Sequence, residues 1–501
     1  MKNSTKVLAL LLSLIMMLSV ATIGSFAAEA TTSTWDGVAV STSLTGTGTA
    51  DDPYLISSAA DLKYLADKVN DGTLNTDGKY FKQTVDIDLA NKPWTPIGND
   101  QKTVGEGEAA AKVSFKGIYD GNLKTIKGLK SDDACAAIEI TTTPAEGETT
   151  ADGTAATPTT ETKYGGVALF GFTQPPTDGN VIIKNLALFG AVSIENAVNA
   201  AGLIAVSESA EISNCYVDVD VTAKGNSKYA AGYVANPTMA LIIENCVNAG
   251  DTTVTDATTA VRAGNFVGYA RGGNNGLTPR NMINCYGLGN VSVSVNGDNN
   301  NIRAGGITGG LYNGVMMKSV HFYGTFTYTN ATDAAVNARV GYFAGGVGYN
   351  AANTLLGANM VVGCTTVVPA GVVEPTVLGA ITAEGAMALI GGGSGLSNPD
   401  VTVATAPAPV PYKVANMFLV EVVVEEETTE EPTTEEETTV EPEDDDDETT
   451  GKTETNAPET NAPTTNKADD DNKGGCASVV GGLSVIAIVA GAALVLAKKK
   501  D

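Results

Sequence analysis

Cysteine is the residue type whose spacing in this sequence could do chemistry. Four of the six cysteines end the same short phrase, in which an aliphatic residue, a spacer and an Asn or Gly come first: Cys215, Cys246, Cys285 and Cys364. Such a set could bind a metal or form disulfides. The chain has one histidine and no Cys-x-x-Cys pair, which disfavours zinc. Stacked side chains that run parallel are awkward for a disulfide, so we expect four reduced, buried thiols.

Three further residues could be reactive. Cys135 borders a segment rich in Thr, Ala and Glu. Cys476 directly precedes a long apolar run, where it could be acylated, pair between chains or serve only as a small residue. His321 is the only histidine, and no serine or cysteine nucleophile motif surrounds it. A Ser-His-Asp triad therefore has no support, and we expect His321 at a surface or corner position.

Carboxylates offer the main catalytic alternative. Several aspartates alternate with apolar residues and could face outward together: Asp86, Asp88, Asp120, Asp218 and Asp220. Two carboxylates roughly 5–10 Å apart suffice for glycoside hydrolysis, but outward aspartates also serve solubility. A lyase would need basic groups as well, and arginines are few: Arg262, Arg271, Arg280, Arg303 and Arg339. The oxygen-rich stretch Asn296–Asn301 could hold calcium, although a turn is the simpler interpretation. We expect no catalytic residue, no metal and no cofactor.

The elements that would position these residues form a repeat between about residues 164 and 368. Its first half is a small-residue phrase: Gly165-Gly166-Val167, Ala201-Gly202-Leu203, Ala231-Gly232-Tyr233, Ala263-Gly264-Asn265, Ala304-Gly305-Gly306-Ile307 and Ala344-Gly345-Gly346-Val347. Its second half carries Asn185, Asn214, Asn245 and Asn284, with altered copies at Ser319 and Gly363. These positions lie 29, 31, 39, 35 and 44 residues apart. Such a period is typical of a solenoid.

Residues after each Asn alternate with period two. Cys215, Val217, Val219 and Val221 would share one face, and Val291, Val293 and Val295 repeat the pattern. This alternation predicts strands buried on one side. We therefore expect an all-β fold, a right-handed parallel β-helix, in preference to a β-sandwich. Asn side chains would hydrogen-bond along the stack and tolerate the left-handed turn, and glycines would fit the tight corners.

The segments on either side of the repeat have different patterns. Ser58 followed by Asp61 predicts a helix start, and Leu62, Leu65, Ala66 and Val69 form its apolar stripe. A lone helix at this place would cap the open end of a solenoid. Within a β-helix domain at residues 31–424, we expect residues 131–163 to be a mobile insertion. We expect residues 374–424 to be a C-terminal end-seal.

The repeat phrases resemble a known family. The Gly-Gly-aliphatic and aliphatic-x-Asn-Cys phrases are similar to those of GLUG-type β-helix repeat surface proteins of Gram-positive bacteria, over about residues 35–368. Trp94-Thr95-Pro96-Ile97-Gly98 and residues 115–122 match the opening phrases of that family. Where the family has a further Gly after the Asn of the second phrase, this chain has Leu123. The resemblance implies a surface address and a role in adhesion or surface interaction.

The sequences at the two ends of the chain predict that the protein is exported and anchored in a membrane. Residues 1–30 match a secretory signal, with cleavage near Ala27, Ala28 or Ala30. Residues 425–476 read as a disordered acidic stalk rich in Thr, Glu and Pro. Between residues 421 and 473 there are 21 acidic and 3 basic residues, which gives −18 of the formal charge of −27. Residues 477–497 match a transmembrane helix, and residues 498–501 a cytoplasmic basic tail.

The sequence leaves three functions open. A cell-surface protein that binds an extracellular glycan or protein, and so acts in adhesion, is the first. A carbohydrate-active enzyme, a polysaccharide lyase or glycosidase, is the second. A passive cell-wall spacer without a ligand is the third. Nucleic acid is disfavoured as a partner because an acidic protein repels phosphate. The membrane would be contacted only through the C-terminal helix.

Overall fold

The computed structural model describes most of the chain between residues 32 and 404. The gaps are residues 106–109, 143, 145–151, 153, 155, 226–227, 259, 272–279, 297–300, 313, 332–337, 349–358, 371, 373–374, 377, 380–386 and 394–395. The regular structure of the described part is almost entirely β-strand, with only two helices, which confirms the expected all-β class. The predicted signal, acidic stalk, apolar run 477–497 and basic tail lie outside the described residues. No helix within the described part is long and apolar enough to cross a membrane.

Two large sheets of parallel strands account for most of the fold. The larger sheet holds β1 (Thr32–Thr34), β2 (Tyr54–Ile56), β3 (Tyr80–Gln83), β4 (Asp86–Asp88), β7 (Ile118–Asp132), β10 (Phe170–Thr173), β11 (Ile182–Ile194), β13 (Ile204–Ser213), β14 (Tyr216–Lys224), β16 (Val234–Glu244), β17 (Val247–Asn248), β18 (Thr252–Ala257), β21 (Arg280–Gly287), β22 (Val291–Val295), β25 (Met316–Phe322), β26 (Phe326–Asn330), β28 (Asn359–Thr366) and β31 (Leu396–Val403). The second sheet holds β12 (Asn199–Ala201), β15 (Lys228–Ala231), β19 (Val261–Gly264), β20 (Ala270–Arg271), β23 (Ile302–Gly305), β24 (Thr308–Tyr312), β27 (Arg339–Gly348), β29 (Leu378–Gly379) and β30 (Ala388–Gly393).

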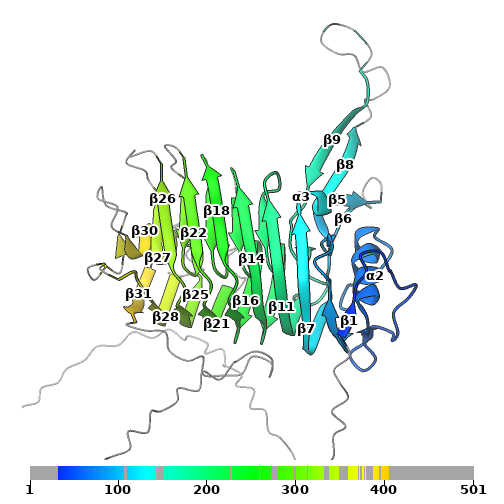
Figure 1. Ribbon diagram of the computed structural model, residues 1–501, viewed down its shortest axis with the longest axis horizontal. Helices are drawn as coiled ribbons and strands as arrows, with labels where there is room; N and C mark the ends of the chain where they lie inside the picture. Colours follow the sequence, from blue (N-terminus) through cyan, green and yellow to red (C-terminus); the bar gives the residue numbers. More distant parts are fainter. Residues whose placement is uncertain are drawn as a thin grey trace, which may run out of the picture. The chain divides into compact units, whose positions relative to one another are not determined.

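Each strand pairs in parallel with the equivalent strand one repeat later. Leu188 of β11 lies opposite Val217 of β14, and Val291 of β22 lies opposite Phe326 of β26. Figure 1 shows these strands following one another in sequence order from β7 to β31. Successive repeats are therefore layers, and residues about thirty positions apart become neighbours.

The side chains on the core-facing side of the strands are apolar. In β14 the burial alternates strictly, with Val217, Val219 and Val221 inside and Asp218 and Asp220 toward solvent. In β22 the same alternation places three valines inside. The strand pattern expected from the sequence is thus confirmed. Each fully buried valine contributes about 1.5–3 kcal/mol, so stability is spread along the stack of layers.

The recurring Asn marks a left-handed backbone turn. Asn185, Asn214, Asn245 and Asn284 have φ between 52° and 54°, and the two altered copies, Ser319 and Gly363, have φ of 53° and 61°. The amide of Asn214 donates to Asn185 Oδ1 at 2.7 Å, and that of Asn284 donates to Asn245 Oδ1 at 3.2 Å. At Asn185 the amide donates instead to Asp120 Oδ1, at 3.0 Å. Asn thus supplies both the turn and a polar contact between layers.

Replacing Asn214 should separate these two contributions. Asn214→Val is expected to lower the free energy of unfolding by about 2 kcal/mol. Valine, unlike asparagine, is poorly tolerated in the left-handed conformation, which costs it about 1–2 kcal/mol. The lost amide hydrogen bond is worth about 1 kcal/mol. Asn214→Gly should cost about 1 kcal/mol, because glycine adopts this φ freely. Denaturant titration of both variants measures the difference, and equal stability of the two would contradict it.

The small-residue phrases align differently from the sequence prediction. Ala231 lies opposite Gly264, one position later in its phrase, and Gly305 lies opposite Gly341. Ala344 therefore pairs with Thr308 rather than with Ala304. The phrases are degenerate in Gly and Ala, so composition alone could not set their register, whereas the unique Asn turns could.

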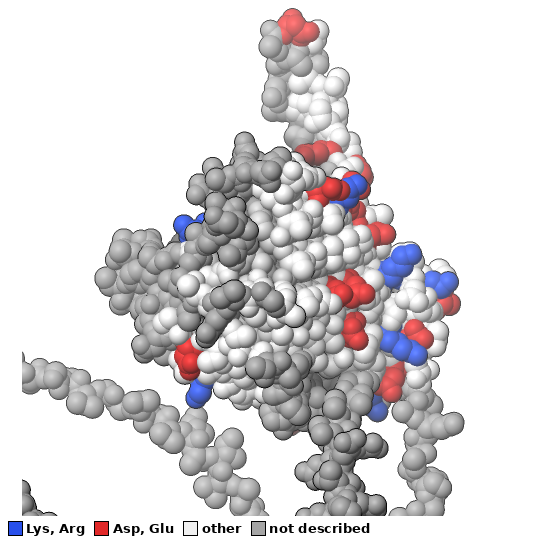
Figure 2. All heavy atoms as spheres, turned by 60° about the vertical axis from the view of Figure 1, so that its left-hand side comes forward, with Lys and Arg blue, Asp and Glu red and all other residues white. Residues whose placement is uncertain are grey.

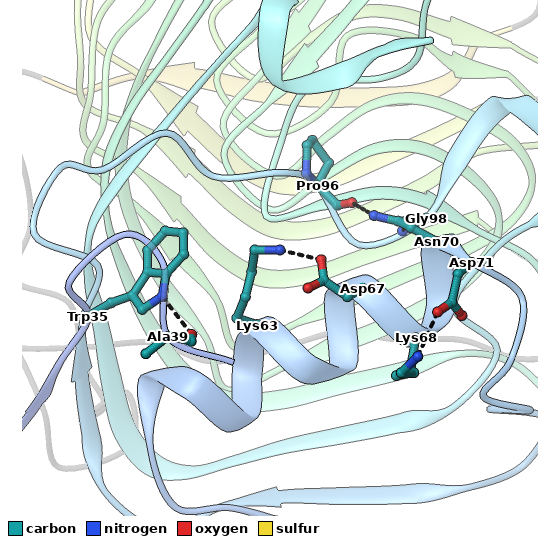
Figure 3. Close-up of polar contacts among 9 residues, drawn as sticks. All are labelled: Trp35, Ala39, Lys63, Asp67, Lys68, Asn70, Asp71, Pro96 and Gly98. Atoms are coloured by element: carbon teal, nitrogen blue, oxygen red, sulfur yellow. Dashed lines mark hydrogen bonds and ion pairs between the residues drawn. The ribbon is translucent and has the colours of Figure 1, made fainter. Parts of the chain in front are cut away.

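The helix expected after Ser58 is present as α2 (Ala59–Asn70). Ser58 Oγ accepts the backbone N–H of Asp61 at 3.1 Å, and the apolar stripe of the helix is buried against the core. Asn70 ties its last turn to the neighbouring chain, donating to Pro96 O and accepting from the Gly98 N–H, both at 2.8 Å (Figure 3). Lysines pair with aspartates along its exposed side, Lys63 with Asp67 and Lys68 with Asp71 (Figure 3).

Two short antiparallel pairs of strands lie beside the parallel sheets. β5 (Asn99–Val104) pairs with β6 (Ala111–Val113). Residues 131–163, the predicted mobile insertion, contain α3 (Asp133–Ala136), β8 (Ala137–Thr142) and most of β9 (Thr159–Tyr164). β8 and β9 form a regular antiparallel ribbon, which Figure 1 shows projecting from the layers. Threonine favours strands, so this Thr-rich segment pairs with itself although it has no apolar face.

Asp133 holds the base of this ribbon to the next layer. Its carboxylate accepts the backbone N–H groups of Glu195, Asn196 and Ala197 at 2.7–2.9 Å. Burial acts to raise the pKa of this carboxyl, and the hydrogen bonds outweigh that effect and hold the pKa below its ordinary value. The ribbon is therefore fixed at its root.

The C-terminal end of the described region continues the layers. β30 pairs in parallel with β27, and β31 pairs with β28 through Cys364 opposite Val401. A separate end-seal was expected over residues 374–424. Of that range, the described residues, which end at 404, add a further strand, β31, which pairs in parallel with β28 with shifts in register near Val361.

Candidate functional site

The four repeat cysteines lie in the interior and not at a reactive surface. Cys215, Cys246, Cys285 and Cys364 are buried and are not joined in disulfides. Each thiol lies 3.2–3.5 Å from the carbonyl oxygen two residues earlier. Burial raises the pKa of Cys285, and it raises the pKa of Cys364 to about 12. Because the thiolate is the nucleophile and the metal ligand, this environment suits packing rather than chemistry.

Cys135 lies in α3 at the base of the β8–β9 ribbon and is not joined in a disulfide either. Burial raises the pKa of its thiol. Cys476 lies outside the described residues.

The aspartates considered for catalysis are engaged by the backbone. Asp86 Oδ1 accepts the Thr125 N–H at 2.8 Å, and Asp120 Oδ1 accepts the Asn122 N–H at 2.8 Å. Asp88 Oδ1 accepts the Ala90 N–H at 2.8 Å, and Asp220 Oδ1 accepts the Asp251 N–H at 3.0 Å. Burial raises the pKa of Asp218, and the nearby Asp220 and Asp251 raise it further. Asp86 and Asp220 thus hold neighbouring layers together, and Asp88 and Asp120 hold their own local turns.

No metal cluster appears in the described part of the chain. Groups of three or more His, Cys, Asp or Glu side chains able to hold an ion are absent there. The possible calcium loop has Asn296 and Asn301 within the description, and its central residues 297–300 lie outside it.

His321 belongs to an aromatic cluster on the outer side of the larger sheet. Tyr286 of β21, His321 of β25 and Thr365 of β28 stand opposite one another on three successive layers. The ring centroids of Tyr286 and His321 lie 4.7 Å apart, and Tyr323 stacks on His321 at 5.9 Å. His321 Nδ1 lies 2.7 Å from Thr365 Oγ1. We call Tyr286, His321 and Tyr323 the aromatic face.

The cluster is held in place by its own packing. His321 and Tyr323 are half-buried, and Tyr286 is nearly covered by its neighbours. Burial lowers the pKa of His321, so its imidazole is neutral at neutral pH. Burial raises the pKa of Tyr286 to about 12, which keeps its phenol protonated. The aromatic face therefore offers flat rings with hydroxyl and imidazole hydrogen-bonding groups and no net charge.

A second aromatic pair stands on the same sheet. Phe189 and Tyr216 have ring centroids 5.6 Å apart, and Tyr216 shares its register column with Val247 and Tyr286. In the view of Figure 2 the charged side chains gather toward the α2 end, and much of the remaining visible surface carries no charge. The outer surface thus includes uncharged areas where aromatic side chains, rather than ions, would make contacts.

Comparison with known proteins gives little guidance. No family model matches the sequence, and no curated protein matches it. Among solved structures, a crystal structure from Bacteroides ovatus, provisionally described as an immunoglobulin A1 protease, is 16% identical, with a TM-score of 0.42. The match covers 72% of this chain and 86% of that chain. A likeness of this extent assigns no activity to this chain.

The structure also brings three arginines together, although the sequence shows only that arginines are few. Arg262, Arg303 and Arg339 stand on three successive layers of the second sheet. Their common feature in the sequence is a Gly two positions later, in Arg-Ala-Gly, Arg-Ala-Gly and Arg-Val-Gly. Extending the repeat by one residue toward the N-terminus would have aligned Arg262 with Arg303, because each directly precedes its Ala-Gly phrase. Arg339 lies five residues before Ala344, so only the structure places it in the same column.

Proposed function

We propose that this protein is displayed at a cell surface and acts by binding. In this proposal the layers are the coils of a right-handed parallel β-helix, and α2 caps its first coil. Support comes from the parallel register of strands one repeat apart and from the recurring left-handed Asn turn. The N-terminal export signal and the C-terminal stalk and membrane helix would place this β-helix outside the cell.

The aromatic face is the proposed contact surface for a glycan. Its supporting observation is the cluster of three rings on the outer side of the sheet, at centroid distances of 4.7–6.2 Å, of which His321 and Tyr323 are stacked and the other two pairs are tilted. Tyrosine provides a large contact area with little loss of side-chain entropy, and its hydroxyl can bond to a polar ligand. Sugars have both apolar ring faces and hydroxyl groups, so this combination suits them.

Binding is a better proposal than hydrolysis for these residues. Asp86, Asp88 and Asp120 each accept a backbone N–H, which fixes them in turns. A general acid needs a raised pKa and access to the glycosidic oxygen. Asp218 has a raised pKa. Its neighbours Asp220 and Asp251 are themselves acidic, so they disfavour a negative charge on Asp218 and supply no basic group.

A glycan array probed with the full chain tests the proposal. We expect binding to a defined set of glycans, and Tyr323→Ala should weaken that binding about tenfold, as loss of one central aromatic contact of about 1.4 kcal/mol does. The matched control is Tyr80→Ala on β3, whose side chain is 37% exposed and lies outside the aromatic face.

Each outcome of this experiment is informative. Equal binding by wild type and Tyr323→Ala would reject the aromatic face as the contact surface. Absence of binding to any glycan or cell surface would reject the binding function and favour the passive spacer. Release of reducing ends from a polysaccharide panel would establish the enzyme instead.

A further inference from the structure

Three arginines form a column on the second sheet. Arg262 of β19 lies opposite Arg303 of β23, and Arg303 lies opposite Arg339 of β27. Neighbouring strands are about 4.8 Å apart, so the three side chains leave the sheet at short, even intervals. Most of the described arginine side chains of this chain are thus concentrated on one narrow strip.

Two tyrosines lie between the guanidinium groups. The guanidinium carbon of Arg262 lies 5.0 Å from the centre of the Tyr269 ring, and that of Arg303 lies 4.7 Å from the centre of the Tyr312 ring. Arg303 Nη1 donates to the Tyr269 hydroxyl and Arg339 Nη1 to the Tyr312 hydroxyl, both at 2.9 Å. Cations are favoured above aromatic faces, so the rings hold the arginines in place. We call these five residues the arginine–tyrosine ladder.

Glycines beneath the ladder make room for it. A Cβ added to Gly310 would come within 2.8 Å of the Tyr269 ring, and one added to Gly346 within 2.8 Å of Arg339 Cδ. These two glycines stand opposite each other on adjacent layers. The absence of a Cβ at these glycines therefore leaves room for the Tyr269 ring and the Arg339 side chain to lie against the sheet.

The ladder has no acidic partner within the described residues. Ion pairs there join lysines to carboxylates, and none includes an arginine. Arg262 is only 7% exposed, and its guanidinium donates to Val261 O at 2.8 Å and to Asn301 O and Oδ1, which leaves Nε without a hydrogen-bond partner. Arg303 and Arg339 are half-buried and are the arginines that a ligand can reach. Burial and the charge of Arg303 both lower the pKa of Arg262. Three close positive charges without an acidic partner repel one another, so a bound anion beside them would be favourable.

We propose that the arginine–tyrosine ladder binds a linear acidic polysaccharide. Guanidinium groups present planar, paired donors that match carboxylate and sulfate oxygens. A column of such groups along the stack suits a polymer with an anion on successive sugars better than it suits one small ion. The tyrosine rings lie between the arginines and keep the guanidinium groups spaced along the stack. This site lies on a different sheet from the aromatic face and does not depend on it.

The test is titration of the full chain with four polymers. Polygalacturonate carries carboxylates, dextran sulfate carries sulfates, dextran is neutral, and poly(U) is a nucleic acid. We expect binding to one or both acidic polysaccharides, with an affinity that falls as salt is added, and none to dextran. Preference between the first two polymers identifies the anion.

Variants connect this binding to the ladder. Arg303→Gln should weaken binding at least tenfold, and Arg303→Lys should not restore it, because lysine lacks the planar fork. Arg339→Gln, at a more peripheral position, should weaken binding without disturbing both rings. Lys184→Gln removes an exposed positive charge from the larger sheet and should bind as wild type does. Tyr323→Ala should also leave binding unchanged, which separates this site from the aromatic face.

Three results would overturn the proposal. One is no binding of either acidic polysaccharide at low salt. Another is equal affinity in wild type, Arg303→Gln and Arg339→Gln when circular dichroism shows all three folded. The third is tighter binding of poly(U) than of both polysaccharides, which would assign the ladder to nucleic acid.

Discussion

Replacing Phe266 by alanine is expected to lower the free energy of unfolding by about 3–5 kcal/mol. The Phe266 ring is fully buried between layers and stacks on Tyr233, with ring centroids 4.7 Å apart and planes 13° from parallel. The Tyr233 hydroxyl lies 2.6 Å from Cys215 O and 2.9 Å from Val247 O, so the neighbouring ring is also fixed to the backbone. The cavity left by Phe266→Ala cannot close without breaking these contacts.

Denaturant titration followed by circular dichroism measures this loss. Met239→Ala is the control, since Met239 is 40% exposed and should cost less than about 1 kcal/mol. A loss below about 1 kcal/mol for Phe266→Ala would show that the layers repack around the missing ring. Because stability in a layered protein is nearly additive between neighbours, the transition should also broaden if the layers near Phe266 unfold first.

A single methyl group at Gly289 is expected to cost about 3 kcal/mol, at the upper end for overpacking. Gly250, Gly289 and Gly324 stand on successive layers. A Cβ added to Gly289 would lie 2.5 Å from the carbonyl carbon of Gly250, and one added to Gly324 would lie 2.7 Å from that of Gly289. These neighbours are backbone atoms, which cannot rotate away as a side chain would. Gly289→Ala must therefore push two layers apart.

Gly179→Ala distinguishes the cost of a steric contact from the cost of backbone strain. No atom lies within 4 Å of a Cβ added there, but Gly179 has φ of +90°, so alanine should cost about 1 kcal/mol through conformation alone. Gly289 is not among the positive-φ glycines. If the melting temperatures of the two variants fell equally, close packing between layers would not be the reason for glycine at position 289.

Much of the layered architecture could be predicted from the sequence because its determinants are local. Alternating valines after Asn214 and Asn284 predicted strands buried on one face, and Asn itself indicated the left-handed turn. Even the altered copies at Ser319 and Gly363 keep that turn, with φ of 53° and 61°. The helix start at Ser58 was equally local, since its side chain bonds to the N–H three residues later.

Features that depend on contacts between layers were predicted less well. The Gly and Ala phrases are too alike for composition to fix their register, and Ala344 pairs with Thr308 rather than with Ala304. Residues 131–163 show almost no aliphatic pattern, so the sequence did not predict that β8 and β9 pair along their backbones. Arginines were counted as scarce, and only the alignment of β19, β23 and β27 places three of them in one column.

The β8–β9 ribbon can vary in length and sequence independently of the layers. The ribbon leaves the layers after α3 and returns at Gly165, whose N–H donates to Ala136 O at 3.0 Å, so its two ends meet at one point. β11 still pairs with β7 across this excursion. A segment whose ends meet can be lengthened, shortened or exchanged while the strands on either side keep their partners. This corner is therefore a natural place to graft a foreign peptide and carry it outward without redesigning the scaffold.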